Sequence, residues 1–147
     1  MTASTVTLEV PEQIRDRFDH YLRDVFQGSA ERVEGLVTDL RRSETVDSPS
    51  WSWTLNRVDA MCHLAAQAPA GEYEGSAEAL GDVLRSVLRS AAENLWAQSE
   101  AVVLDMEAVA RESATIEWAT ARLRELAADG AKFEDVPVLR VQETRAG

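Results

Sequence analysis

The sequence predicts a mainly α-helical fold of about five helices in a bundle-like arrangement, with short β-strands near the N- and C-termini. Apolar residues recur every three or four positions over most of the chain, and only two short segments have a strand-like pattern. Hydrophobic residues make up 45% and charged residues 28% of the 147 positions, a balance typical of a globular domain. We therefore expect a single domain over 1–147, divided into a strand-helix-helix unit (5–42), a helical block (50–130) and a C-terminal strand and tail (133–147).

The N-terminal unit begins with alternating polar and apolar residues over 5–10, the period of a half-buried strand. Pro11 ends this strand and suits the first turn of a helix, where its missing N–H has no partner to lose. Apolar residues continue at helical spacing from Ile14 to Val25. The segment 27–29 then interrupts the pattern, and Ser29 is a candidate N-cap for a second helix that runs to Leu40.

A linker-like composition over 43–50 separates this unit from a third helix, for which Ser50 is the candidate cap. The segment 69–75 contains Pro and Gly and is predicted to be a loop. The third helix is expected to bury one apolar stripe, on which the single cysteine would be a small buried hydrophobe. The members of this stripe are Trp51, Leu55, Val58, Cys62 and Ala65.

The longest helical pattern opens at Ser76 and continues to Ala128, before a stop at Asp129–Gly130. One unbroken helix of that length would be about 78 Å long, far more than the width of a compact chain of this size. A break is therefore expected, and we place it near 112–115. The segment 136–141 is rich in β-branched residues and is predicted to be a short edge strand, since Pro137 excludes a central position.

Residues 5–42 resemble the ribbon-helix-helix family of DNA-binding repressors and antitoxins. This resemblance implies that two chains pair their first strands and that the outward strand residues enter the DNA major groove. Glu9 departs from the family pattern, because a carboxylate repels phosphates and can only accept a hydrogen bond from cytosine. The resemblance rests on Val6, Leu8, Val10, Pro11, Ile14, Phe18, Leu22, Gly28, Ser29, Val33, Val37 and Leu40, and the outward strand residues that it implies are Thr5, Thr7 and Glu9. Arg15 and Arg17, which lie near the strand, are added as DNA-facing candidates because DNA binding would depend on nearby arginines.

The two histidines each follow an aspartate by four positions, in the pairs Asp16–His20 and Asp59–His63. Such spacing places both side chains on one helical face, and two such helices side by side would offer two imidazoles and two carboxylates to a metal ion. Di-metal bundles use Glu-x-x-His pairs instead, which this sequence lacks. The alternative interpretation is that these histidines lie at interfaces or helix ends.

Four tryptophans are the feature that most favours a binding protein. Trp51 and Trp53 are two positions apart on a helix, so they point to different sides. Trp96 and Trp118 lie next to the regularly spaced apolar positions of the long helical pattern over 76–128. Tryptophan outside a core stripe is enriched at protein interfaces. We predict these four residues to be interface candidates, although a wide helix face could also bury them.

The net charge of −11 disfavours nucleic acid and anionic membranes and favours a basic protein partner. No phosphate-binding loop, nucleophile elbow or zinc motif occurs, so we predict no catalytic residues and no cofactor, and an enzyme is the less favoured interpretation. One cysteine, the polar start and the lack of a long apolar run indicate a cytoplasmic protein with no membrane span. The expected function is that of an acidic helical interaction or regulatory protein of the antitoxin, immunity or adaptor type. It is expected to act as a homodimer. Two alternative functions are those of a ribbon-helix-helix-like DNA-binding regulator with a helical effector region and of a small helical metal- or ligand-binding bundle.

Overall fold

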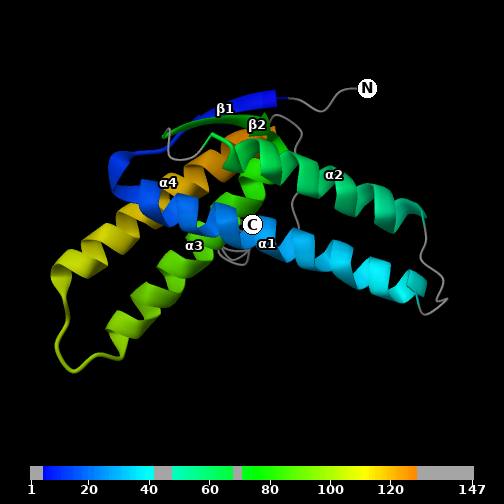
Figure 1. Ribbon diagram of the computed structural model, residues 1–147. Helices are drawn as coiled ribbons and strands as arrows, with labels where there is room; N and C mark the ends of the chain where they lie inside the picture. Colours follow the sequence, from blue (N-terminus) through cyan, green and yellow to red (C-terminus); the bar gives the residue numbers. More distant parts are fainter. Residues whose placement is uncertain (1–4, 42–47, 68–70, 129–147) are drawn as a thin grey trace, which may run out of the picture. The chain divides into compact units, whose positions relative to one another are not determined.

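A computed structural model describes residues 5–41, 48–67 and 71–128 and confirms a mainly helical chain (Figure 1). Over these residues it has four helices and a two-stranded sheet, one helix fewer than expected. The predicted C-terminal strand and tail, 133–147, lie outside the described residues. In chain order the elements are β1 (Thr5–Glu9), α1 (Glu12–Arg41), α2 (Ser48–Ala65), β2 (Glu72–Ser76), α3 (Ala77–Ser99) and α4 (Met106–Ala128).

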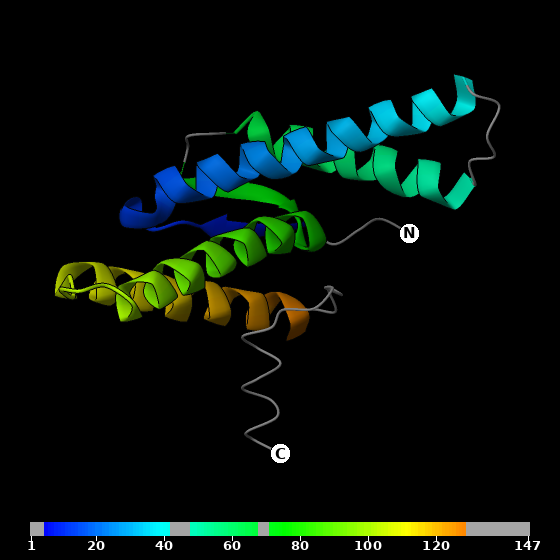
Figure 2. The ribbon, with the colours of Figure 1, turned by 90° about the horizontal axis from the view of Figure 1, so that it is seen from below.

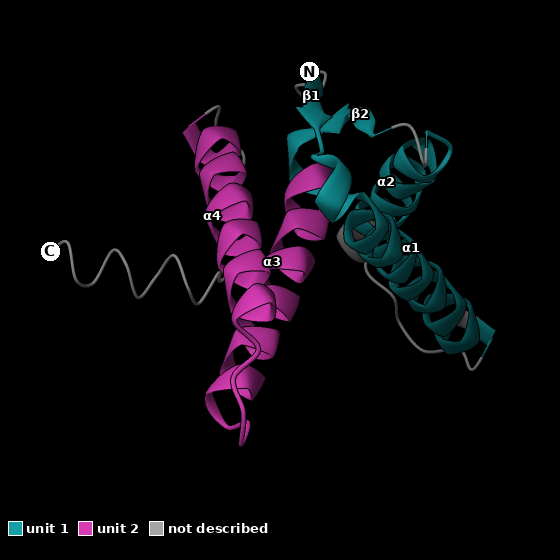
Figure 3. Ribbon diagram, turned by 90° about the vertical axis from the view of Figure 1, so that its left-hand side faces the viewer, with its two compact units in different colours: residues 1–79 teal, residues 80–147 magenta. Residues whose placement is uncertain are grey.

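The chain divides into two compact units, residues 1–79 and 80–147 (Figure 3). The first unit holds the sheet, α1 and α2, and the second holds α4 and all of α3 after its first turn. In the first unit α1 and α2 contact each other as an antiparallel pair (Figures 1 and 2). The expectation of a single domain over 1–147 stays a prediction.

The predicted N-terminal strand is confirmed as β1, with Leu8 and Val10 buried as its alternation requires. β1 pairs antiparallel with β2, and Leu8 lies opposite Tyr73. The loop expected over 69–75 was wrong, because β2 occupies 72–76. The sequence of β2 contains one large apolar residue, Tyr73, which is fully buried, and so it gives little strand signal.

The junction of β1, α1 and β2 is organised around Gly71, whose φ of 78° lies in the left-handed region that glycine tolerates best. The carbonyl oxygen of Gly71 accepts a hydrogen bond from the Val10 N–H at 2.8 Å. A Cβ at Gly71 would lie 2.5 Å from Nε of Arg15, and this Nε donates to the Val10 carbonyl at 3.0 Å. Gly71 therefore suits this backbone conformation, and a side chain at this position would also displace the guanidinium end of Arg15.

Tyr73 connects this junction to the interior of the first unit. Its ring contacts Phe18 with centroids 4.9 Å apart, and its hydroxyl donates a hydrogen bond to Asp19 Oδ1. Burial raises the pKa of Tyr73 well above its ordinary value, and the hydrogen bond and negative charge of Asp19 raise it further, while Arg15 acts in the opposite direction. Tyr73 thus stays a neutral donor inside this unit over the physiological range.

The break expected at 27–29 does not occur, and α1 is one helix of 30 residues. The strand-helix-helix prediction for 5–42 is therefore corrected to a strand and a single helix. Gly28 is exposed, and a single glycine lowers helix propensity without ending a helix. Ser29 does not cap a new helix, because its hydroxyl donates to the Val25 carbonyl one turn earlier, at 2.9 Å.

α2 begins at Ser48, two residues before the predicted cap Ser50, and it is rotated relative to the predicted stripe. It buries Thr54, Met61 and Leu64, whereas Leu55 and Cys62 are exposed. Apolar residues lie on several sides of this helix, so their spacing alone did not select the buried face. Gly75 of β2 marks the buried side, since a Cβ there would lie 2.6 Å from Cδ2 of Leu64.

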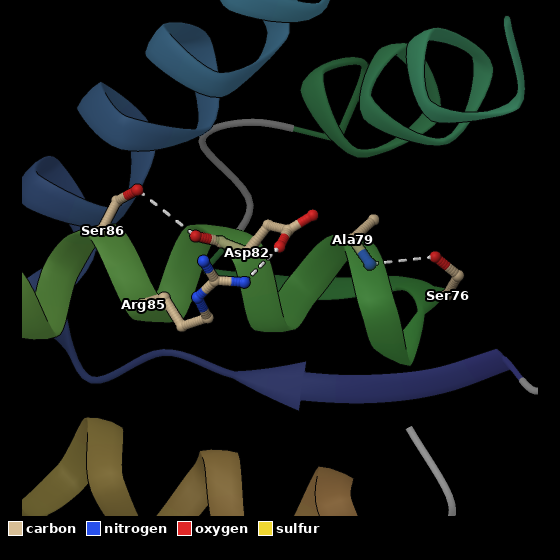
Figure 4. Close-up of polar contacts among 5 residues, drawn as sticks. All are labelled: Ser76, Ala79, Asp82, Arg85 and Ser86. Carbon is tan, nitrogen blue, oxygen red and sulfur yellow. Dashed lines mark hydrogen bonds and ion pairs between the residues drawn. The ribbon is translucent and has the colours of Figure 1, made fainter. Parts of the chain in front are cut away.

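The pattern over 76–128 forms two antiparallel helices that lie side by side (Figures 1 and 2). Ser76 opens α3 as predicted, because its Oγ accepts a hydrogen bond from the Ala79 N–H at 3.1 Å (Figure 4). In the next turn Arg85 forms an ion pair with Asp82 at 3.2 Å, and the Ser86 hydroxyl donates to the Asp82 carbonyl. These contacts stabilise the first two turns of α3.

The break between the two helices lies at 100–105, and the prediction of a break near 112–115 was wrong. Glu112 and Thr115 lie inside α4, and both are buried. The Thr115 hydroxyl donates to the Arg111 carbonyl at 2.9 Å, which satisfies this polar side chain within the helix. The cluster of Glu, Ser and Thr at 112–115 is thus a polar part of a helix.

Candidate interaction surface

Within the described residues, five of the seven exposed large apolar side chains lie in one segment, 96–106. This segment, which we call the hairpin tip, lies where α3 joins α4 (Figure 1). Trp96, on the last part of α3, is 69% exposed, and Val103, at the turn, is 80% exposed. Side chains of this size are seldom exposed so close together on a monomeric surface unless they bind something. The exposed large apolar residues of the tip are Trp96, Val102, Val103, Leu104 and Met106.

The end of α3 is closed by local hydrogen bonds. The N–H groups of Glu100 and Ala101 donate to the carbonyl oxygens of Ala97 and Gln98, at 3.2 and 3.1 Å. The Ser99 hydroxyl donates to the Trp96 carbonyl at 2.6 Å. These bonds satisfy carbonyl groups that the end of a helix would otherwise leave without intrahelical partners.

Asp105 starts α4 as its N-cap. Its Oδ1 accepts hydrogen bonds from the N–H groups of Glu107 and Ala108, at 3.1 and 3.2 Å. Its own N–H donates to Oε1 of Gln98 at 3.1 Å, so the side chain of Gln98 ties the end of α3 to the start of α4. The backbone of the tip is therefore held in place while its apolar side chains point outwards.

A second connection lies below the tip. Nδ2 of Asn94 on α3 donates to Oε1 of Glu112 on α4 at 2.7 Å, and Glu112 is only 2% exposed. A buried carboxylate needs such donors, because its desolvation would otherwise destabilise the fold. The Asn94–Glu112 bond fixes the two helices relative to each other near the tip.

Residues 90–110, which lie between Arg89 and Arg111, carry negative charge alone. No lysine or arginine occurs from 90 to 110, whereas four acidic residues do. All four are exposed: Glu93, Glu100, Asp105 and Glu107. The apolar side chains of the tip are thus flanked by carboxylates.

The predicted interface tryptophans lie on different parts of the chain. Trp53 on α2 is 52% exposed, and the guanidinium groups of Arg32 and Arg57 each lie 5.4 Å from its ring centroid. Trp51 on α2 and Trp118 on α4 are half-buried. Of the four, the hairpin tip contains only Trp96.

Four tip residues, Val102, Val103, Leu104 and Met106, were not among the predicted interface candidates. Val102 and Met106 both fit the three- and four-residue spacing of the helical pattern predicted over 76–128, so nothing in that spacing marks them as exposed. A signal was present in the sequence, because Asp105 followed by Met-Glu-Ala has the form of a helix start with an acidic first turn.

Only some of the candidate DNA-facing residues are exposed to solvent. Thr5, Thr7 and Glu9 are exposed on β1, while Arg15 is engaged with the Val10 carbonyl, and Arg17 is half-buried and also makes a contact. β1 pairs with β2 of the same chain, and α1 replaces the two helices of the ribbon-helix-helix pattern. The fold implied by that resemblance is therefore not the fold observed.

The candidate metal ligands are exposed on two helices, Asp16 and His20 on α1 and Asp59 and His63 on α2. The His20 ring makes an edge contact with Tyr21, with centroids 4.9 Å apart. Over residues 5–41, 48–67 and 71–128, no three His, Cys, Asp or Glu side chains come together in a metal-binding group. In the same ranges, no helix is both long and apolar enough to cross a membrane.

Comparison with known proteins gives no relative for this chain. No protein-family model matches it, and neither a curated protein nor a solved structure is significantly similar to it.

Proposed function

We propose that this protein is an acidic interaction or regulatory protein, of the antitoxin, immunity or adaptor type, and that it binds a protein partner through the hairpin tip. The observation that carries the proposal is the exposure of five large apolar side chains on and beside a turn whose backbone is fixed by the Gln98 and Asp105 hydrogen bonds. A surface that is ordered before binding loses less conformational entropy when a partner covers it.

Burial of the apolar side chains of the tip would stabilise a protein contact. Burying one Val, Leu or Met side chain contributes about 1.5–3 kcal/mol, and a buried tryptophan is among the residues that most often dominate an interface. Trp96, the largest of the five side chains, is 69% exposed, and Val103 is 80% exposed, so we take both as anchors of the contact. A homodimer remains part of this proposal, with a second copy of the chain as one candidate partner.

A site-specific photocrosslinker tests the proposal directly. The variant Val103→p-benzoylphenylalanine would be expressed in the native host and irradiated, and the matched control would carry the same group at Gln13, an exposed position on α1. We expect a discrete crosslinked protein from position 103 and none of that mass from position 13. Equal crosslinking patterns from both positions would contradict a partner at the tip.

A further inference from the structure

The charge around the tip restricts what it can bind. We propose, on the basis of the protein-binding function above, that the partner presents an apolar groove edged by arginine or lysine side chains. The tip would enter the groove with Trp96, Val103 and Leu104, and the flanking carboxylates would face the cations on its edge. This arrangement follows the usual anatomy of an interface, in which an apolar centre is surrounded by a polar rim.

The 21 residues from 90 to 110 contain four carboxylates and no basic side chain. Two tips packed symmetrically against each other would bring eight carboxylates into one contact, and like charges at close range oppose association. An anionic membrane surface would repel the tip for the same reason. A cationic protein surface converts this repulsion into attraction and also steers the encounter.

The four acidic residues have different roles. The Asp105 carboxylate already accepts two backbone hydrogen bonds at the start of α4, so its role is to hold the turn. We assign partner recognition to Glu93, Glu100 and Glu107, whose exposed side chains flank the apolar residues. Asp105→Asn keeps an N-cap acceptor while removing the charge, so this change alone separates the cap from the charge.

The experiment uses the full chain as bait for a displayed library of random peptides. Selection on the wild-type protein is followed by depletion on Val103→Glu, which places a charge at the exposed apex and leaves the hydrogen bonds of the turn intact. Thermal unfolding followed by circular dichroism checks that this variant is folded. We expect the tip-dependent peptides to combine lysine or arginine with large apolar residues.

The affinity of an enriched peptide is then measured for two triple variants by fluorescence anisotropy. The tip variant should bind about tenfold more weakly than wild type, whereas the control, with the same change in net charge in residues outside the tip, should stay within about twofold. Added salt should weaken wild-type binding. The tip variant is Glu93→Gln, Glu100→Gln and Glu107→Gln, and the control is Asp24→Asn, Glu34→Gln and Glu72→Gln.

Several outcomes overturn this inference. Tip-dependent peptides without basic residues, or equal affinity for the tip variant and wild type, would show an apolar partner instead and leave the proposed function standing. If the selected peptides bind wild type and Val103→Glu equally, the inference of a basic, apolar partner is also rejected. Crosslinking at position 103 would then test the proposed function independently. Retention of wild type, but not of Val103→Glu, on phosphatidylcholine–phosphatidylglycerol vesicles would reassign the tip to lipid.

Discussion

The Oε1 atom of Gln98 accepts a hydrogen bond from the Asp105 N–H at 3.1 Å, and this bond joins the end of α3 to the start of α4. Val102, Val103 and Leu104, three of the exposed apolar residues of the hairpin tip, lie between the two residues that it joins. The turn therefore keeps its geometry without covering Val102, Val103 or Leu104.

We predict that Gln98→Ala loosens the turn and lowers the free energy of unfolding by about 0.5–1.5 kcal/mol, the usual contribution of one hydrogen bond. Urea denaturation measures this change. Gln13→Ala, at an exposed position of α1, is the control and should change the stability by less than about 0.5 kcal/mol. Equal effects of the two substitutions would show that the Gln98 contact contributes nothing.

The N-cap of α4 gives a second prediction. Asp105→Ala should lower the stability by about 1 kcal/mol, because the N–H groups of Glu107 and Ala108 lose their acceptor. Asp105→Asn should retain most of the stability, since asparagine caps helices about as well as aspartate. If Asp105→Asn were as unstable as Asp105→Ala, the charge and not the cap would hold the turn.

Two glycines that look alike in the sequence should respond in opposite ways to alanine. Gly71→Ala combines a positive φ with a Cβ placed 2.5 Å from Arg15 Nε, so we expect a loss of more than about 1 kcal/mol. Gly28→Ala lies inside α1, where a Cβ meets nothing within 4 Å, and should stabilise the protein by about 0.5–1 kcal/mol. Chemical denaturation of both variants against wild type checks the pair. A stabilising Gly71→Ala would show that the junction can rearrange.

The parts of this fold that could be predicted are those that depend on short segments of the sequence. The strand at 5–9, the start of α3 at Ser76 and the mainly helical content follow from alternation, capping and helical spacing, which are properties of short segments. The turn at 100–105 was missed because Val102 and Met106 fit a helical rhythm, and periodicity does not distinguish a buried stripe from an exposed turn that continues its spacing.

Tertiary contacts account for the remaining differences. β2 exists because Tyr73 reaches Phe18 and Asp19, more than fifty residues earlier in the chain, and no local pattern contains that information. The hairpin tip could be found in part, since Trp96 was predicted as an interface residue. The rest of the tip depends on which apolar side chains the fold leaves exposed, and that is decided by packing.

The buried tyrosine predicts a dependence of stability on alkaline pH. Because the pKa of Tyr73 is raised in the folded state, its contribution is complete below the ordinary tyrosine pKa of about 10 and is lost as the pH rises beyond it. Above that pH the unfolded chain loses the Tyr73 proton while the folded chain keeps it, so unfolding becomes more favourable. Tyr73→Phe should reduce this alkaline loss, although it also removes the hydrogen bond to Asp19.

Absorbance near the tyrosinate band provides the measurement. The sequence has two tyrosines, so in Tyr21→Phe the alkaline absorbance change reports Tyr73 alone. We expect that change to coincide with unfolding followed by circular dichroism. Ionisation of Tyr73 at its ordinary pKa, in a chain that is still folded, would contradict the buried hydrogen bond.

Two tryptophans predicted as interface residues can be tested against each other. Trp96 is 69% exposed on the hairpin tip, so Trp96→Ala should leave the stability within about 0.5 kcal/mol of wild type while weakening association at least tenfold. Trp118 is half-buried in α4, and Trp118→Ala should lower the stability because a large side chain is removed from a partly packed position.

Sedimentation velocity measures the association and so tests the homodimer, with Trp53→Ala on α2 as the control for an exposed tryptophan that is not part of the tip. If the chain pairs with itself through the tip, Trp96→Ala should shift the dimer to monomer and Trp53→Ala should not. If the partner is a different, basic protein, wild type and both variants should sediment alike when each is alone. Trp96→Ala should then show weaker association only when that partner is added. Full binding of the Trp96→Ala variant in both assays would remove the tip from the interface, because no other residue of the tip offers as large a side chain to a partner.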